Sequence, residues 1–330
     1  MATTTTMTRT LGRSGIEVSA LGFGCWAIGG PFWRGDKAAG WGEVDDAEST
    51  RAVRRALDLG VTFFDTADVY GTGHSEEVLG AALAGRRDEV VIATKWGNTF
   101  DPARRQLTGS DLSPKYLRSA VEGSLRRLGT DRIDVYQLHP QPAAAEALDL
   151  VAELDALVDE GLIRAYGWSV DDPDRIAAFA AGSAASVVQH VLNVLEDAPA
   201  VLAACDTYDL GSIARAPLMM GLLSGKFTAE STISRDDVRG AQPEWLTYFR
   251  DGRPAPEFLA RLEAVRDVLT SDGRTLVQGA LAWIWARGPR TVPIPGFRTV
   301  AQVEENAGAL ARGPLTPAQF AEVERLLGRA

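Results

Sequence analysis

Short apolar runs alternate with longer amphipathic stretches along the whole chain, and this alternation constrains the fold more than any other feature. Several of the runs are apolar nearly throughout, as is typical of parallel strands that are buried on both faces. Eight runs occur, at residues 18–26, 62–67, 90–96, 133–139, 163–170, 186–193, 211–218 and 291–297.

The stretches between the runs carry helix signals. Ser113-Pro114 suits a cap and first turn, and Gly129 stands where that helix should end. Helices are predicted at residues 45–59, 76–83, 113–128, 143–158, 172–180, 198–207, 256–269, 276–287, 300–310 and 317–327. Eight strands alternating with helices predict the α/β class and a single (β/α)8 TIM barrel over residues 1–330. The alternative is a doubly wound open sheet.

Three further features refine the predicted barrel. Residues 9–19 hold Gly12-Arg13-Ser14-Gly15 between β-prone residues, which predicts an N-terminal hairpin that closes the barrel floor. Residues 1–8 are predicted to be disordered. Enlarged loops are expected at the C-terminal face of the barrel, at residues 26–42, 96–111 and 224–254.

Charge and composition exclude several classes of protein. Lys and Arg number 34 against 44 Asp and Glu, and the net charge of −10 disfavours a protein that coats nucleic acid or anionic lipid. No apolar run reaches the roughly 18 residues that a membrane span needs, and the Thr-rich start is unlike a secretory signal. Two cysteines, Cys25 and Cys205, predict buried core residues in a cytoplasmic protein. The oligomeric state leaves no signal in the sequence.

Polar side chains stand near the C-terminal ends of the runs, where a barrel has its active site. Asp65 and Tyr70 belong to the second run and its loop, Lys95 to the third and His139 to the fourth. A buried carboxylate or ammonium is unfavourable unless it is paired, and Asp65 and Lys95 lie at similar depth on neighbouring predicted strands. They form either a structural ion pair or part of a reaction centre. Tyr70 and His139 at the same rim favour the reaction centre.

This set of side chains suits proton donation to an oxygen that gains negative charge. The Tyr70 phenol is protonated at neutral pH because its unperturbed pKa is about 10. The Lys95 ammonium is expected to lower that pKa, and the imidazole of His139 can orient a carbonyl oxygen. Such groups assist hydride attack on a carbonyl carbon. No residue is a hydride donor, so a nicotinamide cofactor would supply the hydride.

Two segments after the seventh and eighth runs suit phosphate groups, which barrels often bind at this place. The first combines small residues, a hydroxyl and a lysine, and the second sets an arginine before a helix N-terminus. The alternatives are a glycine turn and a solvated arginine. The residues concerned are Leu218, Gly221, Ser224 and Lys226 in the first segment, and Gly296, Arg298, Thr299, Gln302, Glu305 and Asn306 in the second.

Other patterns carry less weight. Gly22–Ala27 matches a dinucleotide fingerprint, but Gly29-Gly30-Pro31 would break the helix that must follow. Gly24 and Trp26 are therefore predicted to lie at the rim of the first strand, facing the pocket. Trp283 and Trp285 are predicted core residues, whereas Phe32, Trp33 and Trp41 either line an apolar pocket or pack their loop. No His/Cys cluster has metal-ligand spacing, so no metal site is predicted.

Several of these segments together make the chain resemble the aldo-keto reductase superfamily, from about Arg9 to the end. The resemblance implies a (β/α)8-barrel carbonyl reductase that uses NADPH. The motifs that carry it are residues 64–71 (Phe-Asp-Thr-Ala-Asp-Val-Tyr-Gly), Thr94-Lys95, residues 136–139, Gly167-Trp168-Ser169, Pro217-Leu218 through Gly225-Lys226, residues 293–298 and Glu305-Asn306.

The resemblance also implies residue roles. Tyr70 would be the general acid, tuned by Asp65 and Lys95, with His139 orienting the carbonyl. Ser169 and Gln189 would bind the nicotinamide carboxamide. Leu218, Gly221, Ser224 and Lys226 would contact the pyrophosphate, and Gly296, Arg298, Thr299, Gln302, Glu305 and Asn306 would hold the adenosine end, with Arg298 at the 2′-phosphate.

Two positions depart from the family pattern. Val170 stands where the family usually has Asn, so one carboxamide hydrogen bond is missing or replaced. Arg215 stands where the family often has an aromatic residue that stacks on the nicotinamide. A guanidinium plane can also stack, but its charge is unfavourable beside an oxidised nicotinamide, so NADP⁺ is expected to bind more weakly than NADPH.

These observations lead to three hypotheses about function. The first is NADPH-dependent, reversible reduction of an aldehyde or ketone, with a small-molecule carbonyl substrate of unspecified structure. The second is a cofactor-binding regulatory subunit of the same fold with little catalysis. The third is a barrel isomerase or hydrolase that uses Asp65 and His139 without a cofactor. Turnover of carbonyl compounds, with Tyr70→Phe as control, separates them.

Overall fold

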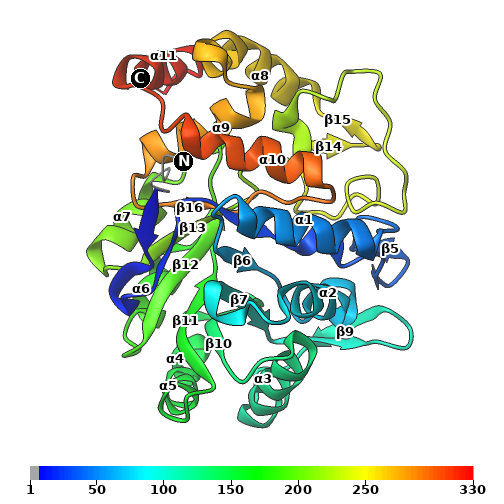
Figure 1. Ribbon diagram of the computed structural model, residues 1–330, viewed down its shortest axis with the longest axis vertical. Helices are drawn as coiled ribbons and strands as arrows, with labels where there is room; N and C mark the ends of the chain where they lie inside the picture. Colours follow the sequence, from blue (N-terminus) through cyan, green and yellow to red (C-terminus); the bar gives the residue numbers. More distant parts are fainter. Residues whose placement is uncertain (1–6, 330) are drawn as a thin grey trace.

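The computed structural model describes residues 7–329, and eight parallel strands form a nearly closed barrel at its centre (Figure 1). Gly24 and Gly296 close the ring between the first and last strands, where the Gly24 amide donates to the carbonyl of Pro295 at 3.0 Å. The prediction of a (β/α)8 barrel is confirmed, and the open-sheet alternative is wrong. In order around the barrel the strands are β3 (Gly22–Gly24), β6 (Phe63–Asp65), β7 (Val91–Trp96), β10 (Ile133–Leu138), β11 (Ile163–Ser169), β12 (Ala185–Val191), β13 (Gly211–Arg215) and β16 (Val292–Pro293).

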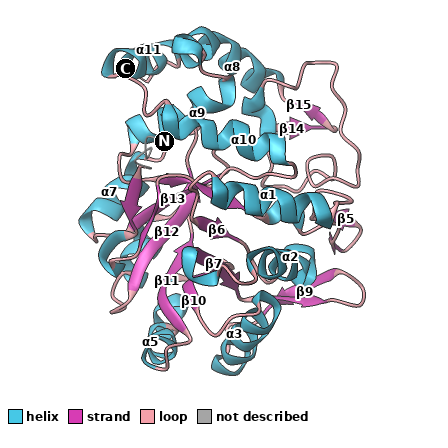
Figure 2. Ribbon diagram, in the orientation of Figure 1, coloured by secondary structure: helices cyan, strands magenta, loops and turns pink. Residues whose placement is uncertain are grey.

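Helices surround the strands (Figure 2). Asp45 and Ser113 cap their helices with side-chain oxygens, as the sequence indicates for Ser113. The predicted helix at residues 143–158 is divided at Leu150 into two. The helices are α1 (Asp46–Asp58), α2 (His74–Leu83), α3 (Pro114–Leu128), α4 (Ala144–Asp149), α5 (Val151–Asp159), α6 (Pro173–Phe179), α7 (Pro199–Thr207), α8 (Pro256–Leu269), α9 (Leu276–Arg287), α10 (Val300–Gly308) and α11 (Pro317–Leu326).

The predicted hairpin is present and lies under the barrel. Strands β1 (Thr8–Thr10) and β2 (Glu17–Ser19) pair antiparallel. Two expectations need correction here. Thr8 pairs with Ser19 instead of belonging to a disordered start, while residues 1–6 lie outside the described residues. The first apolar run is two strands, because Ser19 bonds to Leu21 and to Thr62 and ends β2 before β3 begins.

The hairpin closes the floor of the barrel with apolar side chains. Leu11, Ile16 and Val18 pack in one buried cluster with inward-facing residues of the strands. Arg13 donates at 2.6–2.8 Å to the carbonyls of Ala180, Gly182 and Ala185, so it ties the hairpin to the start of β12. Apolar side chains therefore fill the floor along this hairpin, and the large cavity lies at the opposite face of the barrel.

Two glycines of the hairpin, Gly12 and Gly15, are expected to tolerate substitution to different degrees. Gly12 and Gly15 both have left-handed backbone, with φ of +52° and +68°. A Cβ at Gly12 would lie 2.5–2.6 Å from three backbone atoms, whereas a Cβ at Gly15 would meet nothing within 4 Å. We expect Gly12→Ala to lower the free energy of unfolding by about 3 kcal/mol and Gly15→Ala by about 1 kcal/mol, measured by urea denaturation. Equal losses would show that the hairpin is not held against the floor.

The loops at the C-terminal face are enlarged, as predicted. The first and third carry short strands that join in one small sheet, and the seventh carries a further hairpin. These strands are β4 (Trp33–Arg34), β5 (Lys37–Ala38), β8 (Asn98–Asp101), β9 (Gln106–Ser110), β14 (Phe249–Arg250) and β15 (Arg253–Pro254). Trp283 and Trp285 are buried, as are the free cysteines Cys25 and Cys205, as predicted. Within residues 7–329, no helix is both long enough and apolar enough to span a bilayer.

Candidate active site

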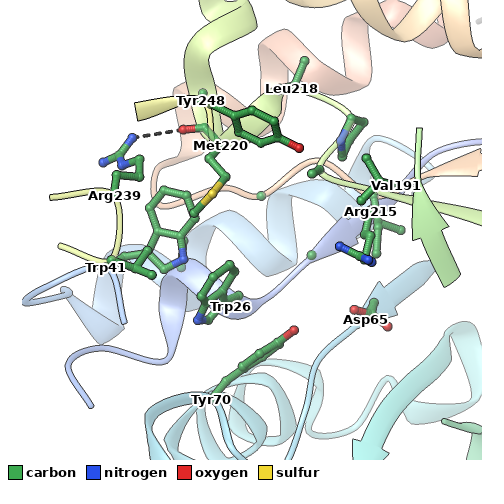
Figure 3. Close-up of a pocket in the computed structure, with 18 of the residues that line it drawn as sticks. Trp26, Trp41, Asp65, Tyr70, Val191, Arg215, Leu218, Met220, Arg239 and Tyr248 are labelled. Carbon is green, nitrogen blue, oxygen red and sulfur yellow. Dashed lines mark hydrogen bonds between the residues drawn. The ribbon is translucent and has the colours of Figure 1, made fainter. Parts of the chain in front are cut away.

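A cavity of about 2270 Å³ opens at the C-terminal ends of the strands (Figure 3). Figure 3 shows Tyr70, Asp65 and Arg215 gathered at one end, with Trp26 beside them. With the exception of Lys95, each residue predicted for the site lines this cavity. Lys95 lies just beneath the surface, with a side chain that is 1% exposed. Residues from strand ends and loops that are far apart in the sequence therefore line one cavity.

Lys95 is the centre of a buried polar network. Its ammonium donates to Asp65 Oδ1 at 2.5 Å and to the carbonyl of Thr66 at 2.8 Å, and it lies 3.5 Å from the Tyr70 hydroxyl. Gln137 and Gln189 both donate to Asp65 Oδ2, at 2.9 and 2.7 Å. Both carboxylate oxygens are therefore occupied, which fixes Asp65 and through it Lys95.

Tyr70 is held by a tight turn after β6. It begins the short 3-10 segment Tyr70–Gly73, in which Gly71 has a φ of +61°. A Cβ on Gly71 would lie 1.8 Å from the carbonyl oxygen of Gly29, so only glycine allows this approach. The Tyr70 ring stacks on Trp26 with centroids 5.7 Å apart, which leaves the hydroxyl directed towards Lys95.

The charges around Tyr70 differ from the sequence-based expectation. Burial raises the pKa of Tyr70 above its ordinary value, and the opposing effect of Lys95 does not cancel this rise. Burial alone would lower the pKa of Lys95, but Asp65 and Tyr70 raise it overall, so the ammonium is retained. The phenol therefore holds its proton throughout the neutral range, beside a fixed positive charge.

His139 faces Tyr70 as a neutral imidazole. The two rings meet edge to face with centroids 5.8 Å apart. Burial, together with the charges of Lys95, Arg215 and Arg34, keeps the pKa of His139 well below its ordinary value. Its Nδ1 is buried without a hydrogen-bond partner among the described residues. An uncharged ring of this kind can donate a single hydrogen bond to a carbonyl oxygen.

A second buried histidine gives the fold a pH dependence. His190 on β12 bonds to Ser212 Oγ at 2.8 Å, and burial lowers its pKa to about 4. Below its unfolded pKa of about 6.5 the unfolded chain binds a proton that the folded chain does not, so stability falls as the pH drops from 6.5 towards 4. We expect His190→Gln to lose about 1 kcal/mol less unfolding free energy than the wild type between about pH 7 and about pH 5.5. An equal change in unfolding free energy between the two pH values for the wild type and for His190→Gln, measured by urea denaturation, would contradict this assignment.

Two of the residues expected at the nicotinamide, Gln189 and Arg215, already have side-chain partners. Ser169 is 6% exposed at the end of β11, and Gln189 is committed to Asp65. Arg215 forms an ion pair with Asp171, whose other oxygen accepts from the Val191 amide at 2.7 Å. Asp171 thus offsets the positive charge of Arg215. The expectation that NADP⁺ binds more weakly than NADPH rested on that charge, so its basis is weaker.

The segment after β13 fits a pyrophosphate. Gly221 has a φ of +91°, and a Cβ there would lie 3.6–3.7 Å from Lys226 and Arg239. Lys226 forms no ion pair or hydrogen bond within residues 7–329, and burial with Arg239 nearby lowers its pKa. Arg239 is fixed by Asp237 at 2.6 Å and by the carbonyl of Met220. Two adjacent cations over a glycine form an anion cradle.

The segment after β16 forms the far end of the cavity. Thr299 caps α10, and Gln302 accepts from the Arg298 amide at 2.7 Å. The Arg298 guanidinium donates to the backbone carbonyls of Trp41 and Glu43 in the first loop. The cavity wall at this end also contains Gly296, Glu305 and Asn306.

The sequence does not point to several lining or supporting residues, and five of them bear directly on the site. Gln137 interrupts an apolar run two residues before His139, which is a usable signal. Asp171 directly follows the fifth run, but its pairing with Arg215 becomes visible only once the strand ends are placed side by side. Arg239, Trp245 and Glu48 come from loops or a helix end and carry no local signal. Of the aromatic residues of the first loop, Phe32 and Trp41 line the cavity.

Comparison with known proteins decides the family. Residues 20–327 match the aldo/keto reductase family. The chain therefore belongs to the aldo/keto reductase family. It is 33% identical over 302 residues to aldo-keto reductase YhdN of Bacillus subtilis, covering 88% of this chain and 85% of that one. It is 31% identical over 313 residues to aldo-keto reductase yakc [NADP(+)] of Schizosaccharomyces pombe, covering 92% and 86%.

Solved structures of this family share the fold. Aldo-keto reductase AKR11C1 from Bacillus halodurans in its holo form has a TM-score of 0.80 at 28% identity, with 98% of this chain and 97% of that chain covered. Glycerol dehydrogenase AKR11B4 from Gluconobacter oxydans has a TM-score of 0.81 at 29% identity, with 98% and 95% covered. As an aldo/keto reductase the chain is an oxidoreductase that uses a nicotinamide cofactor.

Proposed function

We propose that this aldo/keto reductase reduces an aldehyde or ketone to the alcohol, reversibly, with NADPH as cofactor. The observation that carries the proposal is the 3.5 Å approach of the Tyr70 hydroxyl to a buried, charge-paired Lys95 at the mouth of a large cavity. A relative named for NADP(+) supports the choice of cofactor.

The cavity suits a dinucleotide along its length. Lys226, Gly221 and Ser224 would hold the pyrophosphate, and the cradle at Gly221, which a Cβ would fill, supports this assignment. Gly296, Arg298, Thr299, Gln302, Glu305 and Asn306 would hold the adenosine end. Gly24, Trp26, Ser169, Gln189, Leu218 and Arg215 would surround the nicotinamide end. When bound, reduced nicotinamide supplies a hydride.

The chain itself supplies the proton. Tyr70 would give its phenolic proton to the carbonyl oxygen as negative charge develops there. The Lys95 ammonium stabilises the phenolate that remains, and Asp65 holds that ammonium in place. The neutral ring of His139 would donate a hydrogen bond to the same oxygen and fix its direction. Gln137 and Gln189 act through Asp65 as positioning residues.

The wall beside Tyr70 is rich in aromatic side chains, which favours an apolar or aromatic carbonyl compound. Trp26 packs edge to face on Trp41 at 5.3 Å, and Trp245 lies 6.4 Å from Trp26 with 59% of its surface exposed. Phe32 extends this wall in the first loop. An exposed tryptophan at a cavity mouth suits contact with a flat apolar ligand.

Fluorescence titration with NADPH and NADH, followed by a screen of carbonyl compounds, tests the proposal. Cofactor binding with loss of reduced nicotinamide on carbonyl addition is the expected result. Tight binding without turnover would instead favour a regulatory subunit, and turnover of any substrate without cofactor would favour an isomerase or hydrolase. Two buried free thiols fit the reducing conditions of a cytoplasm, which we propose as the location.

A further inference from the structure

A carboxylate from α1 reaches into the far end of the cavity. Glu48 lies in the first turn of α1, which packs against α10 (Figure 1), and it lines the cavity together with Arg298 and Thr299. Its Oε1 accepts from the amide of Val300, the first residue of α10, at 2.8 Å. Amides in the first turn of a helix have no partner within the helix and attract anions. The chain thus provides its own anion for this amide.

Glu48 is held in its charged form. Arg51 donates to Glu48 Oε2 from two nitrogens, at 2.7 and 3.1 Å. The bond from Val300, followed by that from Arg51, keeps the pKa of Glu48 below its ordinary value. The Glu48 carboxylate is therefore ionised throughout the neutral range; Arg51 pairs with its Oε2, and its Oε1 faces the start of α10.

Arg298 also already has hydrogen-bond acceptors within the chain. Its guanidinium donates to the carbonyls of Trp41 at 3.2 Å and of Glu43. The two groups expected to receive a 2′-phosphate, the start of α10 and the guanidinium of Arg298, thus already have acceptors. Glu48 is the charged one of these acceptors, and a phosphate monoester at this place would have to displace it.

We propose that Glu48 determines how strongly the chain distinguishes NADH from NADPH, an inference that rests on the proposed function. A 2′-phosphate carries about 1.5 to 2 negative charges at neutral pH and is repelled by the carboxylate. A ribose 2′-hydroxyl is a hydrogen-bond donor, for which a carboxylate is a suitable acceptor. Arg298 favours the phosphate and Glu48 opposes it, so the two cofactors bind with affinities within about tenfold of each other.

A second acidic contact between the same helices provides a matched control. Glu304 on α10 accepts from Arg55 of α1 at 2.8 Å, and its side chain does not line the cavity. Glu304→Gln removes the same charge from the same pair of helices as Glu48→Gln. The two variants therefore separate a role towards the cofactor from a role in helix packing.

Isothermal titration calorimetry of the full chain with NADPH and with NADH tests the inference. For Glu48→Gln we expect NADPH to bind about tenfold more tightly and NADH about threefold more weakly. Glu48→Ala should shift the ratio of the two dissociation constants in the same direction, and Glu304→Gln should leave it unchanged. Because the ratio compares two ligands on one protein, a general loosening of the α1–α10 contact cancels.

The possible results are distinguishable. Binding of both cofactors to the wild type with an unchanged ratio in Glu48→Gln and Glu48→Ala would overturn the inference while leaving the proposed function intact. An equal shift in Glu304→Gln would also overturn it, because general electrostatics would then explain the effect. Absence of binding of both cofactors to the wild type, by calorimetry and by fluorescence titration, would refute the proposed function itself.

Discussion

Tyr70→Phe is expected to lower kcat for carbonyl reduction by about 10² to 10⁴, while the dissociation constant of NADPH changes by less than about twofold. The substitution removes a single oxygen, the proton donor that lies 3.5 Å from the Lys95 ammonium. The ring remains, and with it the stacking on Trp26 at 5.7 Å. Steady-state turnover and fluorescence titration of the same preparation measure both quantities.

His139→Gln is the matched comparison for this variant. It retains a hydrogen-bond donor at the same rim but alters its position, so we expect a smaller loss of kcat than for Tyr70→Phe. If Tyr70→Phe retained wild-type turnover, the phenol would not be the acid, and water or another group would have to supply the proton.

Lys95→Met is expected to have the largest effect on stability. It leaves the Asp65 carboxylate buried, with Gln137 and Gln189 as donors but no opposing charge. Breaking a buried ion pair from one side destabilises a protein by about 3–5 kcal/mol. Urea denaturation should show this loss, and kcat should fall with it because no ammonium remains to stabilise a phenolate.

The double variant Asp65→Asn/Lys95→Met distinguishes charge from packing. It removes both charges and keeps an amide of the same shape for the glutamine contacts, so we expect it to recover more than about half of the lost stability without recovering activity. A single variant Lys95→Met as stable as the wild type would show that the pair is not buried as described.

The strands and helices could be predicted from the sequence because buried strands read as short apolar runs and the helices between them carry capping and termination signals. Strands such as 133–138 and 163–169 are covered on both faces and read as apolar runs, and caps such as Ser113 mark helix starts. The division between β2 and β3 could not be predicted, because it depends on contacts of Ser19 with Leu21 and with the distant Thr62. Hydrophobic periodicity does not report such contacts.

In the candidate site too, residues marked by a local sequence pattern could be predicted, and contacts between residues distant in the sequence could not. Residues at strand ends, such as Asp65 and Lys95, were predictable because a barrel brings all its strand ends to one face. The commitment of Gln189 to Asp65 was not, since it depends on side-chain directions across the barrel. Glu48 was not predictable either, because its role arises only from the packing of α1 on α10.

Transfer of deuterium from NADPH that is fully deuterated at C4 of the nicotinamide tests the central claim most directly. With a carbonyl compound found in the screen, mass spectrometry of the alcohol should show one deuterium on the former carbonyl carbon. An alcohol free of deuterium, or no alcohol from any carbonyl compound while NADPH binds, would contradict the account.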